Sequence, residues 1–140
     1  TELQSITGRK MLVVVHAAGD SVNNTATAMA ETAKAFPELL FIMAHAGFIW
    51  CYGTTSAVSI PVPNLMLDLT LNVGPYSVQE AYNACGPQRF TIGADGPFDF
   101  VEIKAPIVRA LTGDDDEAFE LIMGGNLAKY LGIPKIQITA

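Results

Sequence analysis

Four short apolar segments recur along the chain, and each gives way to a polar residue. They end at His16, at His45, near Thr70 and at Asp95, roughly 25 to 29 residues apart, against about 30 for a βαβ unit. This spacing predicts four consecutive strand–helix units. Because such units build parallel sheets, the repeat indicates an α/β fold.

The strands are expected where β-branched and other apolar residues run together. Met11 to Val15 and Leu39 to Ala44 are continuous apolar runs, as in strands buried on both faces. Leu65 to Leu71 and Phe90 to Ala94 predict the third and fourth strands. Each strand then ends beside a polar residue.

Helices are expected between the strands. Apolar residues at helical spacing predict a helix from about Thr25 to Phe36, which Pro37 stops. A second helix is expected around Trp50 to Val58. A third is expected over Ser77 to Cys85, with Ser77 as its N-cap.

The last third of the chain is predicted to be helical. Pro106 suits the first position of a short helix. Asp114 to Glu117 form a capping-box pattern that opens a helix to about Met123, and a further helix, Asn126 to Leu131, is closed by Gly132 and Pro134. No linker-like segment divides residues 1–140, so one domain is expected.

Composition limits the partners. Half of the 140 residues are hydrophobic, which allows a sizeable core. The net charge is -6 with eight Lys and Arg, too few for a nucleic-acid or anionic membrane surface. The apolar run from Leu39 to Gly53 is shorter than the roughly 20 residues of a membrane span. We expect a small-molecule ligand, with neither nucleic acid nor membrane as a partner.

Two features predict a cytoplasmic protein. Cys51 and Cys85 are isolated, without the density of a disulfide scaffold, so both are expected to be reduced core thiols. The first residues, Thr-Glu-Leu-Gln-Ser-Ile, lack the basic start and apolar stretch of a signal peptide.

His16, His45 and Asp95 are the candidate site residues. The carboxyl ends of parallel strands carry ligand chemistry in α/β proteins, and these three residues follow predicted strands there. Two imidazoles and a carboxylate suit a divalent metal such as zinc, which also keeps a position for water. Each residue alone is more often a backbone-bonded histidine or a turn aspartate, but three strands ending in step favour a site.

Trp50, Tyr52 and Phe98 follow strands and are candidates to line a pocket, although aromatic residues there equally pack into cores. The sequence has neither a phosphate-loop pattern nor a serine in a nucleophile elbow.

Residues 36–47, 63–70, 87–98 and 125–128 resemble, in order, the C-terminal half of the amidohydrolase-related (amidohydrolase 2) metal-dependent hydrolases, the family that includes aminocarboxymuconate semialdehyde decarboxylase. The strongest motif is Arg89-Phe-Thr-Ile-Gly-Ala-Asp95-Gly-Pro-Phe98, which is similar to the eighth strand of these barrels. Ala94 stands where the family has serine.

The resemblance implies a (β/α)8 barrel and roles for three residues. His16 matches the metal ligand of the fifth strand. His45 matches the sixth-strand histidine that acts on substrate or water. Asp95 matches the eighth-strand aspartate, which binds metal and shuttles a proton. The implied cofactor is a divalent metal, with zinc first among the candidates.

The chain departs from the family in one essential point. The family's first strand carries a His-x-His metal pair, whereas this chain has two histidines, His16 and His45. The expected structure is therefore about four βα units, the C-terminal half of a TIM-type barrel. The departure also leaves open whether this chain alone is an enzyme.

Three functions stay open. The first is the C-terminal part of a metal-dependent hydrolase or nonhydrolytic decarboxylase of a small, aromatic or unsaturated, carboxylic acid or of an ester or amide, completed by an N-terminal half. The second is an inactive, truncated or self-associating half-barrel, for example a homo-oligomer. The third is a small α/β ligand-binding module.

Overall fold

The computed structural model describes residues 2–8, 11–17, 25–71 and 78–134, and no side chain at 3, 7, 47–53 or 101. Its centre is a four-stranded parallel sheet whose order, β1-β2-β3-β4, is the order of the chain. Each crossover therefore leads to the neighbouring strand, as expected from the repeat. The strands are β1 (Leu12–His16), β2 (Leu40–Ala44), β3 (Leu65–Asp68) and β4 (Phe90–Thr91).

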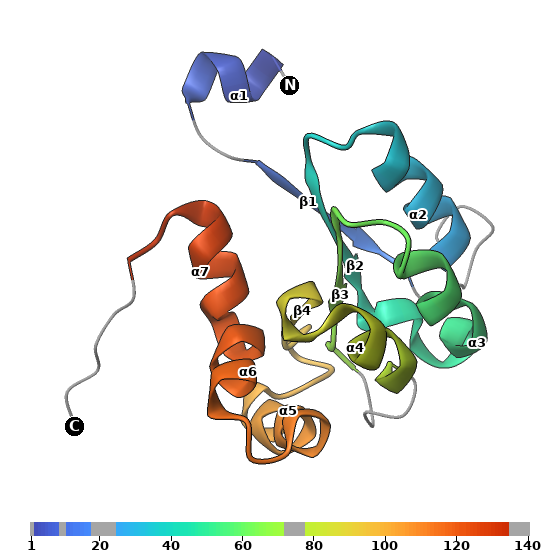
Figure 1. Ribbon diagram of the computed structural model, residues 1–140, viewed down its shortest axis with the longest axis vertical. Coiled ribbons are helices and arrows are strands. Elements are labelled where there is room, and N and C mark those ends of the chain that lie inside the picture. Colours follow the sequence, from blue (N-terminus) through green and yellow to red (C-terminus); the bar gives the residue numbers. More distant parts are fainter. Residues whose placement is uncertain (1, 9–10, 18–24, 72–77, 135–140) are drawn as a thin grey trace.

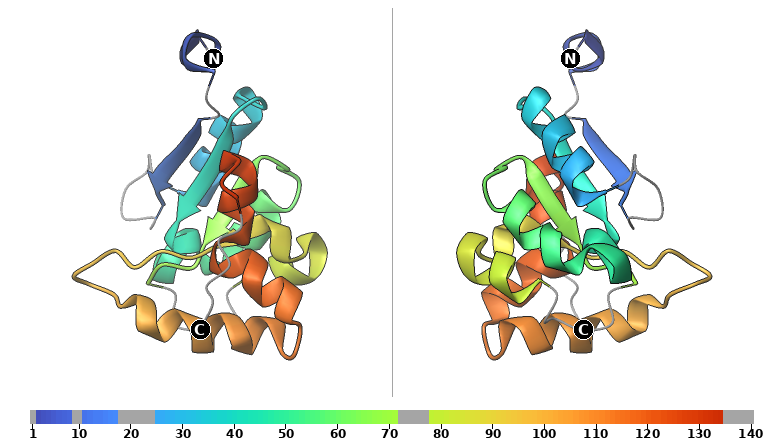
Figure 2. Two further views of the ribbon diagram at one scale, coloured as in Figure 1. Left: turned by 90° about the vertical axis from the view of Figure 1, so that its left-hand side faces the viewer. Right: turned by 90° about the vertical axis from the view of Figure 1, so that its right-hand side faces the viewer.

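Helices lie on both sides of this sheet. A group of helices packs together over one face (Figure 2, right), and helix 126–131 lies along the opposite side (Figure 1). In chain order the helical segments are α1 (Glu2–Thr7), α2 (Ala26–Ala35), η1 (His45–Gly47), α3 (Phe48–Ser59), α4 (Gln79–Cys85), η3 (Pro87–Arg89), η4 (Val101–Ile103), α5 (Lys104–Thr112), α6 (Asp116–Glu120), the π-helical η5 (Leu121–Gly125) and α7 (Asn126–Leu131). The group of helices over one face of the sheet consists of α2, α3 and α4.

Successive residues of each strand point to opposite faces of the sheet. Phe41, Met43, Leu65, Leu67 and Phe90 belong to the buried core that the helices cover. The residues between them point the other way, toward what would be the inside of a barrel. On that inner face Val14 is 60% exposed, so the core is built on one side of the sheet and the other side is partly open.

The predicted first crossover helix is confirmed. Thr25 caps α2 by accepting a hydrogen bond from the Ala28 amide at 3.2 Å. At the other end, the Asn64 side-chain amide donates to the carbonyl oxygens of Ala33, Phe36 and Leu39, at 2.8, 3.1 and 3.0 Å. Asn64 thus satisfies the carbonyls where α2 turns into β2.

The third and fourth strands are shorter than predicted. β3 ends at Asp68 and β4 at Thr91, and the last ladder contact is the Leu69 amide to the Thr91 carbonyl at 2.9 Å. Leu71 then has a left-handed backbone (φ 55°), which turns the chain away from the sheet. Residues 92–94 pair with no strand in the described part of the chain, so the predicted extension to Ala94 is wrong.

Two helix starts also differ from the sequence expectation. Pro106 is the third residue of α5, still within the first turn, where its missing amide leaves no helical bond unmade. The cap of α6 is Asp115, one residue beyond the expected Asp114, and it accepts from the Ala118 amide at 2.9 Å. The Ser77 cap lies outside the described residues.

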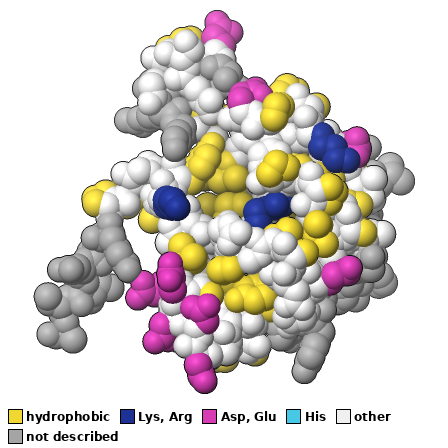
Figure 3. Space-filling model, viewed as in Figure 1, with side chains coloured by type: hydrophobic (Ala, Val, Ile, Leu, Met, Phe, Trp, Pro, Cys, Tyr) yellow, Lys and Arg dark blue, Asp and Glu magenta, His cyan; other side chains and the backbone are white. Residues whose placement is uncertain are grey.

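The tail returns to the sheet. The Asn126 side chain donates to the Pro87 and Phe90 carbonyls, both at 2.8 Å, and so fixes the start of α7 beside β4. Gly132 ends α7 in the left-handed conformation (φ 70°), as predicted from sequence. Figure 3 shows apolar side chains in the hollow between α7 and the strands. No helix in the described ranges is long and apolar enough to cross a bilayer.

Candidate active site

The two histidines meet at the carboxyl ends of neighbouring strands. His16 closes β1 and pairs in register with Ala44, so His45, the next residue, begins the turn after β2. Nδ1 of His16 lies 3.0 Å from Nε2 of His45 and the rings meet edge to face. One nitrogen donates and the other accepts, so the two tautomers are linked. His45 is buried, whereas His16 is exposed.

The turn that carries His45 has an unusual backbone. His45 and Ala46 both adopt positive φ angles, 68° and 44°, which non-glycine residues rarely do. The hydroxyl of Thr55, in α3, donates to the Ala46 carbonyl at 3.0 Å. Such a conformation persists where surrounding contacts fix it, and it is common at functional sites.

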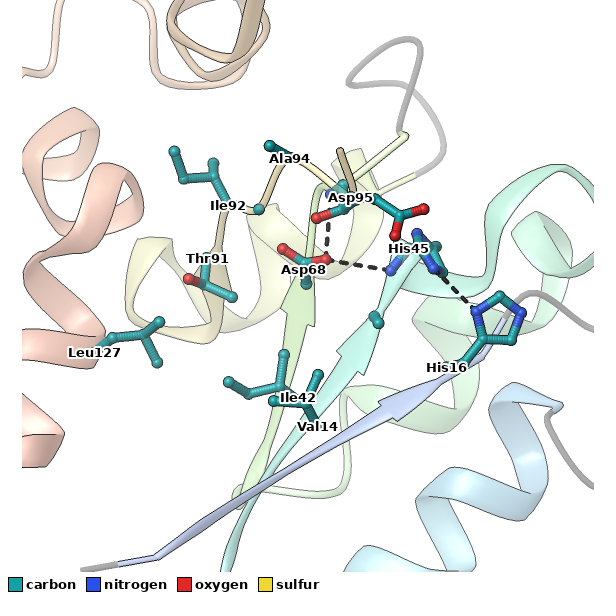
Figure 4. Close-up of a pocket in the computed structure, with 13 residues that line it drawn as sticks. Val14, His16, Ile42, His45, Asp68, Thr91, Ile92, Ala94, Asp95 and Leu127 are labelled. Atoms are coloured by element: carbon teal, nitrogen blue, oxygen red, sulfur yellow. Dashed lines mark hydrogen bonds between the residues drawn. The ribbon is translucent and has the colours of Figure 1, made fainter. Parts of the chain in front are cut away.

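Asp68 is a site residue that the sequence analysis missed. It ends β3 with its side chain buried, and its Oδ2 atom accepts from the His45 and Thr70 backbone amides, each at 3.3 Å (Figure 4). Burial raises the pKa of the Asp68 carboxyl, while hydrogen bonds from Thr70 and His45 oppose the rise. The available signal was a carboxylate inside the apolar run 65–71.

Asp95 belongs to the same pocket. It follows β4 in an exposed turn with a φ of 47°, and its carbonyl accepts from the Phe98 amide at 3.0 Å. The structure thus brings all three predicted residues to the rim of one pocket, and it adds Asp68 from the strand between them.

The pocket has a volume of about 410 Å³, a size that suits a small organic ligand. Polar groups gather at the strand ends, and Val14, Ile42 and Leu127 form an apolar part (Figure 4). Gly93 lies so close to β3 that a Cβ on it would come 2.4 Å from the Thr70 hydroxyl oxygen. The full lining is Val14, His16, Ile42, Ala44, His45, Asp68, Thr70, Thr91, Ile92, Gly93, Ala94, Asp95 and Leu127.

The loops behind the pocket are joined by a buried ion pair. The Lys104 ammonium contacts the Asp99 carboxylate and also donates to the Leu69 carbonyl at 3.2 Å. Asp99 Oδ2 accepts from the Leu71 amide at 2.8 Å. Burial alone would raise the pKa of Asp99, but Lys104 and two backbone amides lower it overall. The pair fastens the loop after Asp95 to the end of β3.

The donor types fit a divalent metal, but the described residues supply an incomplete set. Within 2–8, 11–17, 25–71 and 78–134, no three His, Cys, Asp or Glu side chains converge as a metal site. A zinc site takes three or four protein ligands. This part of the chain can contribute to such a site and does not form one by itself.

The remaining candidates are not among the described residues that line the pocket. Phe98 is 78% exposed and does not line it. The side chains of Trp50, Tyr52 and Cys51 are outside the described part. Cys85 is a free thiol that is half-buried, not a core residue. Arg89 of the sequence motif serves the fold: its guanidinium donates to the Leu65 and Ser59 carbonyls at 2.7 and 2.9 Å and also to that of Val62.

No protein-family model matches the chain, and no curated protein does either. Among solved structures, a zinc-bound amidohydrolase from Burkholderia multivorans is 15% identical, with a TM-score of 0.69 over 95% of this chain and 55% of its own.

Two further solved structures are similar. An uncharacterized TIM-barrel protein from Bordetella bronchiseptica is 20% identical, with a TM-score of 0.68 over 94% of this chain and 48% of its own. A 5-carboxyvanillate decarboxylase from Sphingomonas paucimobilis is 12% identical, with a TM-score of 0.65 over 95% of this chain and 52% of its own.

The comparison fits the strand order described above. The chain spans about half the length of these solved structures. The neighbours include the amidohydrolase group that the sequence motifs resemble, so the fold expectation is confirmed. The chain therefore has the fold of about half of a TIM barrel.

Proposed function

We propose that this chain is the C-terminal part of a metal-dependent barrel enzyme, a hydrolase or a nonhydrolytic decarboxylase of a small carboxylic acid, ester or amide. The observation that carries the proposal is one pocket at the carboxyl ends of parallel strands that is lined by His16, His45, Asp68 and Asp95. Barrel enzymes hold their chemistry at that end.

In this proposal His16 and Asp95 contribute ligands to a divalent metal, and the rest of the barrel supplies the others. Zinc is the first candidate because imidazole and carboxylate donors suit it, and because the Burkholderia amidohydrolase carries it. When bound, the metal would lower the pKa of a coordinated water and polarise a substrate oxygen.

His45, Asp95 and the apolar lining of the pocket also have roles in the proposed reaction. His45 faces both the pocket and His16, so it exchanges a proton with the substrate or with water. Asp95, exposed at the rim, takes up a proton as the reaction proceeds. The apolar part around Val14, Ile42 and Leu127 receives the carbon skeleton of the substrate.

The proposed compartment is the cytoplasm, and the proposed domain organisation is one domain over residues 1–140.

The first test is native mass spectrometry of the purified protein with and without zinc, alongside its denatured mass. Zinc uptake by an assembly that contains a complete barrel supports the proposal. That assembly is then assayed with aromatic and unsaturated carboxylic acids for CO2 release, and with esters and amides for hydrolysis.

His45→Ala is the informative variant in this assay. It should lower turnover while leaving bound zinc unchanged, because His45 acts beside the metal. Thr32→Ala, on the exposed side of α2, is the matched control. Equal loss of zinc and turnover in the His45 variant would contradict its role, and an active barrel that binds no metal would refute the metal-dependent mechanism.

A second candidate is an inactive half-barrel that self-associates. Two observations favour it: β1 and β4 are the edges of the sheet, and Val14 is exposed on the inner face. This candidate predicts a homodimer that takes up no zinc in the same mass measurement.

A further inference from the structure

We infer that Asp68 is a positioning residue, which holds His45 in the geometry that directs its ring toward His16. The inference rests on the proposed function only for the role of His45; the geometry stands by itself. Asp68 lies at the end of β3, between the strands that carry the histidines and the strand that precedes Asp95.

The contact that supports this inference is made to the backbone of His45. A single oxygen of Asp68 accepts from the amides of both His45 and Thr70, each at 3.3 Å. The Thr70 side chain is a further hydrogen-bonding partner of the carboxylate. Asp68 therefore links the turn after β2 to the turn after its own strand.

His45 has a backbone conformation that requires supporting contacts. His45 has a φ of 68°, and a histidine in this region is disfavoured without supporting contacts. Asp68 fixes the amide side of the turn, and Thr55 fixes the carbonyl of Ala46. With the backbone fixed at both points, Nε2 of His45 is brought to 3.0 Å from Nδ1 of His16.

Gly93, just after β4, leaves room for the Asp68 carboxylate and the Thr70 side chain. The hypothetical Cβ of Gly93 would lie 3.3 Å from Oδ1 of Asp68 and 2.4 Å from the Thr70 hydroxyl oxygen. Glycine thus lets the backbone after β4 approach the carboxylate. Asp68 is only 6% exposed, and burying a carboxylate is costly unless its bonds are specific. A buried carboxylate at this point is best explained by the turn that it holds.

The test is NMR on the uniformly 15N-labelled protein, without metal or substrate. In the wild type, the His45 and Thr70 amides should be protected from hydrogen exchange, and the two imidazoles should show a ring-to-ring nuclear Overhauser effect. Fast exchange of both amides in the folded wild type would overturn the inference without any variant.

Three variants then separate positioning from general stability. Asp68→Ala should raise the exchange rate of the His45 amide about tenfold, as for one lost hydrogen bond, and abolish the ring contact. Asp68→Asn, which keeps an acceptor of the same shape, should restore the ring contact. Thr91→Val is the control, since Thr91 lines the same pocket and its buried hydroxyl has no hydrogen-bond partner in the described residues.

An Asp68→Ala protein that keeps the ring contact and the protected His45 amide would refute the inference, whatever its melting temperature. These measurements need neither turnover nor zinc. If the protein binds no metal but Asp68→Ala still loses the ring contact, the proposed function fails and the positioning role stands.

Discussion

The hydroxyl of Tyr130 donates to the carbonyl oxygen of Met11 at 2.9 Å, although the two residues are 119 positions apart. Tyr130 belongs to α7, and Met11 immediately precedes β1, the opposite edge of the sheet from β4. Asn126 fixes the start of the same helix to β4. Helix α7 therefore connects the two edge strands across the open side of the half-barrel (Figure 2, left).

Tyr130→Phe should lower the free energy of unfolding by about 1 kcal/mol, because it removes one partly buried hydrogen bond without changing the ring. Urea denaturation measures the difference. Tyr82→Phe is the matched control: its ring packs on Phe90, and the described residues give its hydroxyl no hydrogen bond. Equal effects of the two substitutions would show that the Tyr130–Met11 bond adds nothing.

Asp99→Asn should lower the free energy of unfolding by about 3 kcal/mol at pH 7, because it leaves the fully buried Lys104 ammonium without its counter-charge. The pKa of Asp99 is lowered in the folded protein, so the carboxylate stabilises it above the unfolded value of 3.8. That contribution is lost as pH falls through the folded pKa.

The difference between wild type and Asp99→Asn should therefore narrow as pH falls below 3.8. Denaturation of both proteins across this range measures it, and other carboxyl groups cancel in the comparison. A difference that stays constant down to pH 2 would contradict the ion-pair explanation.

Gly93→Ala should destabilise the protein by about 2 kcal/mol, because its Cβ would overlap the Thr70 hydroxyl oxygen at the pocket floor. Gly96→Ala is the control, since nothing lies within 4 Å of a Cβ there. Thr70→Ala removes the overlapping atom, so the Gly93→Ala substitution should cost less in a Thr70→Ala background. Thermal unfolding of the four variants and the wild type tests this; additive effects would refute the close contact.

Arg89→Lys should lower the free energy of unfolding by about 2 kcal/mol. A lysine cannot present the planar donors that reach the carbonyls of Leu65, Ser59 and Val62. Arg109→Lys is the control; its ion pair with Asp116 is exposed and worth under about 1 kcal/mol. Chemical denaturation measures both. Similar small losses would mean that the Arg89 contacts are readily replaced.

The sequence predicts the strand–helix repeat well because burial imposes a pattern on it. β1 and β2 are continuous apolar runs, and the helix after β1 has a capping threonine and a proline stop, so their limits agree with the structure within two residues. β4 was predicted too long because its end depends on where β3 turns away, at Leu71. That is a relation between strands, which a local pattern does not contain.

The candidate site was predictable in part for the same reason. His16, His45 and Asp95 interrupt or follow apolar strands, and the structure places them on one pocket. Asp68 was missed because its partners are the amides of His45 and Thr70, which become visible only in three dimensions. The left-handed turn at His45 was likewise not predictable, because neither His45 nor Ala46 is a glycine, the residue that adopts positive φ angles without steric cost.

The agreement between strand order and chain order has a consequence for how the molecule folds. Each strand pairs with the one made just before it, so the sheet can grow unit by unit from β1 to β4, and each step closes a loop of modest length. The contact between Tyr130 and Met11 spans 119 residues, so during synthesis it cannot form before α7 has been made. The four units can thus assemble in sequence, with α7 docking after the four strands have paired.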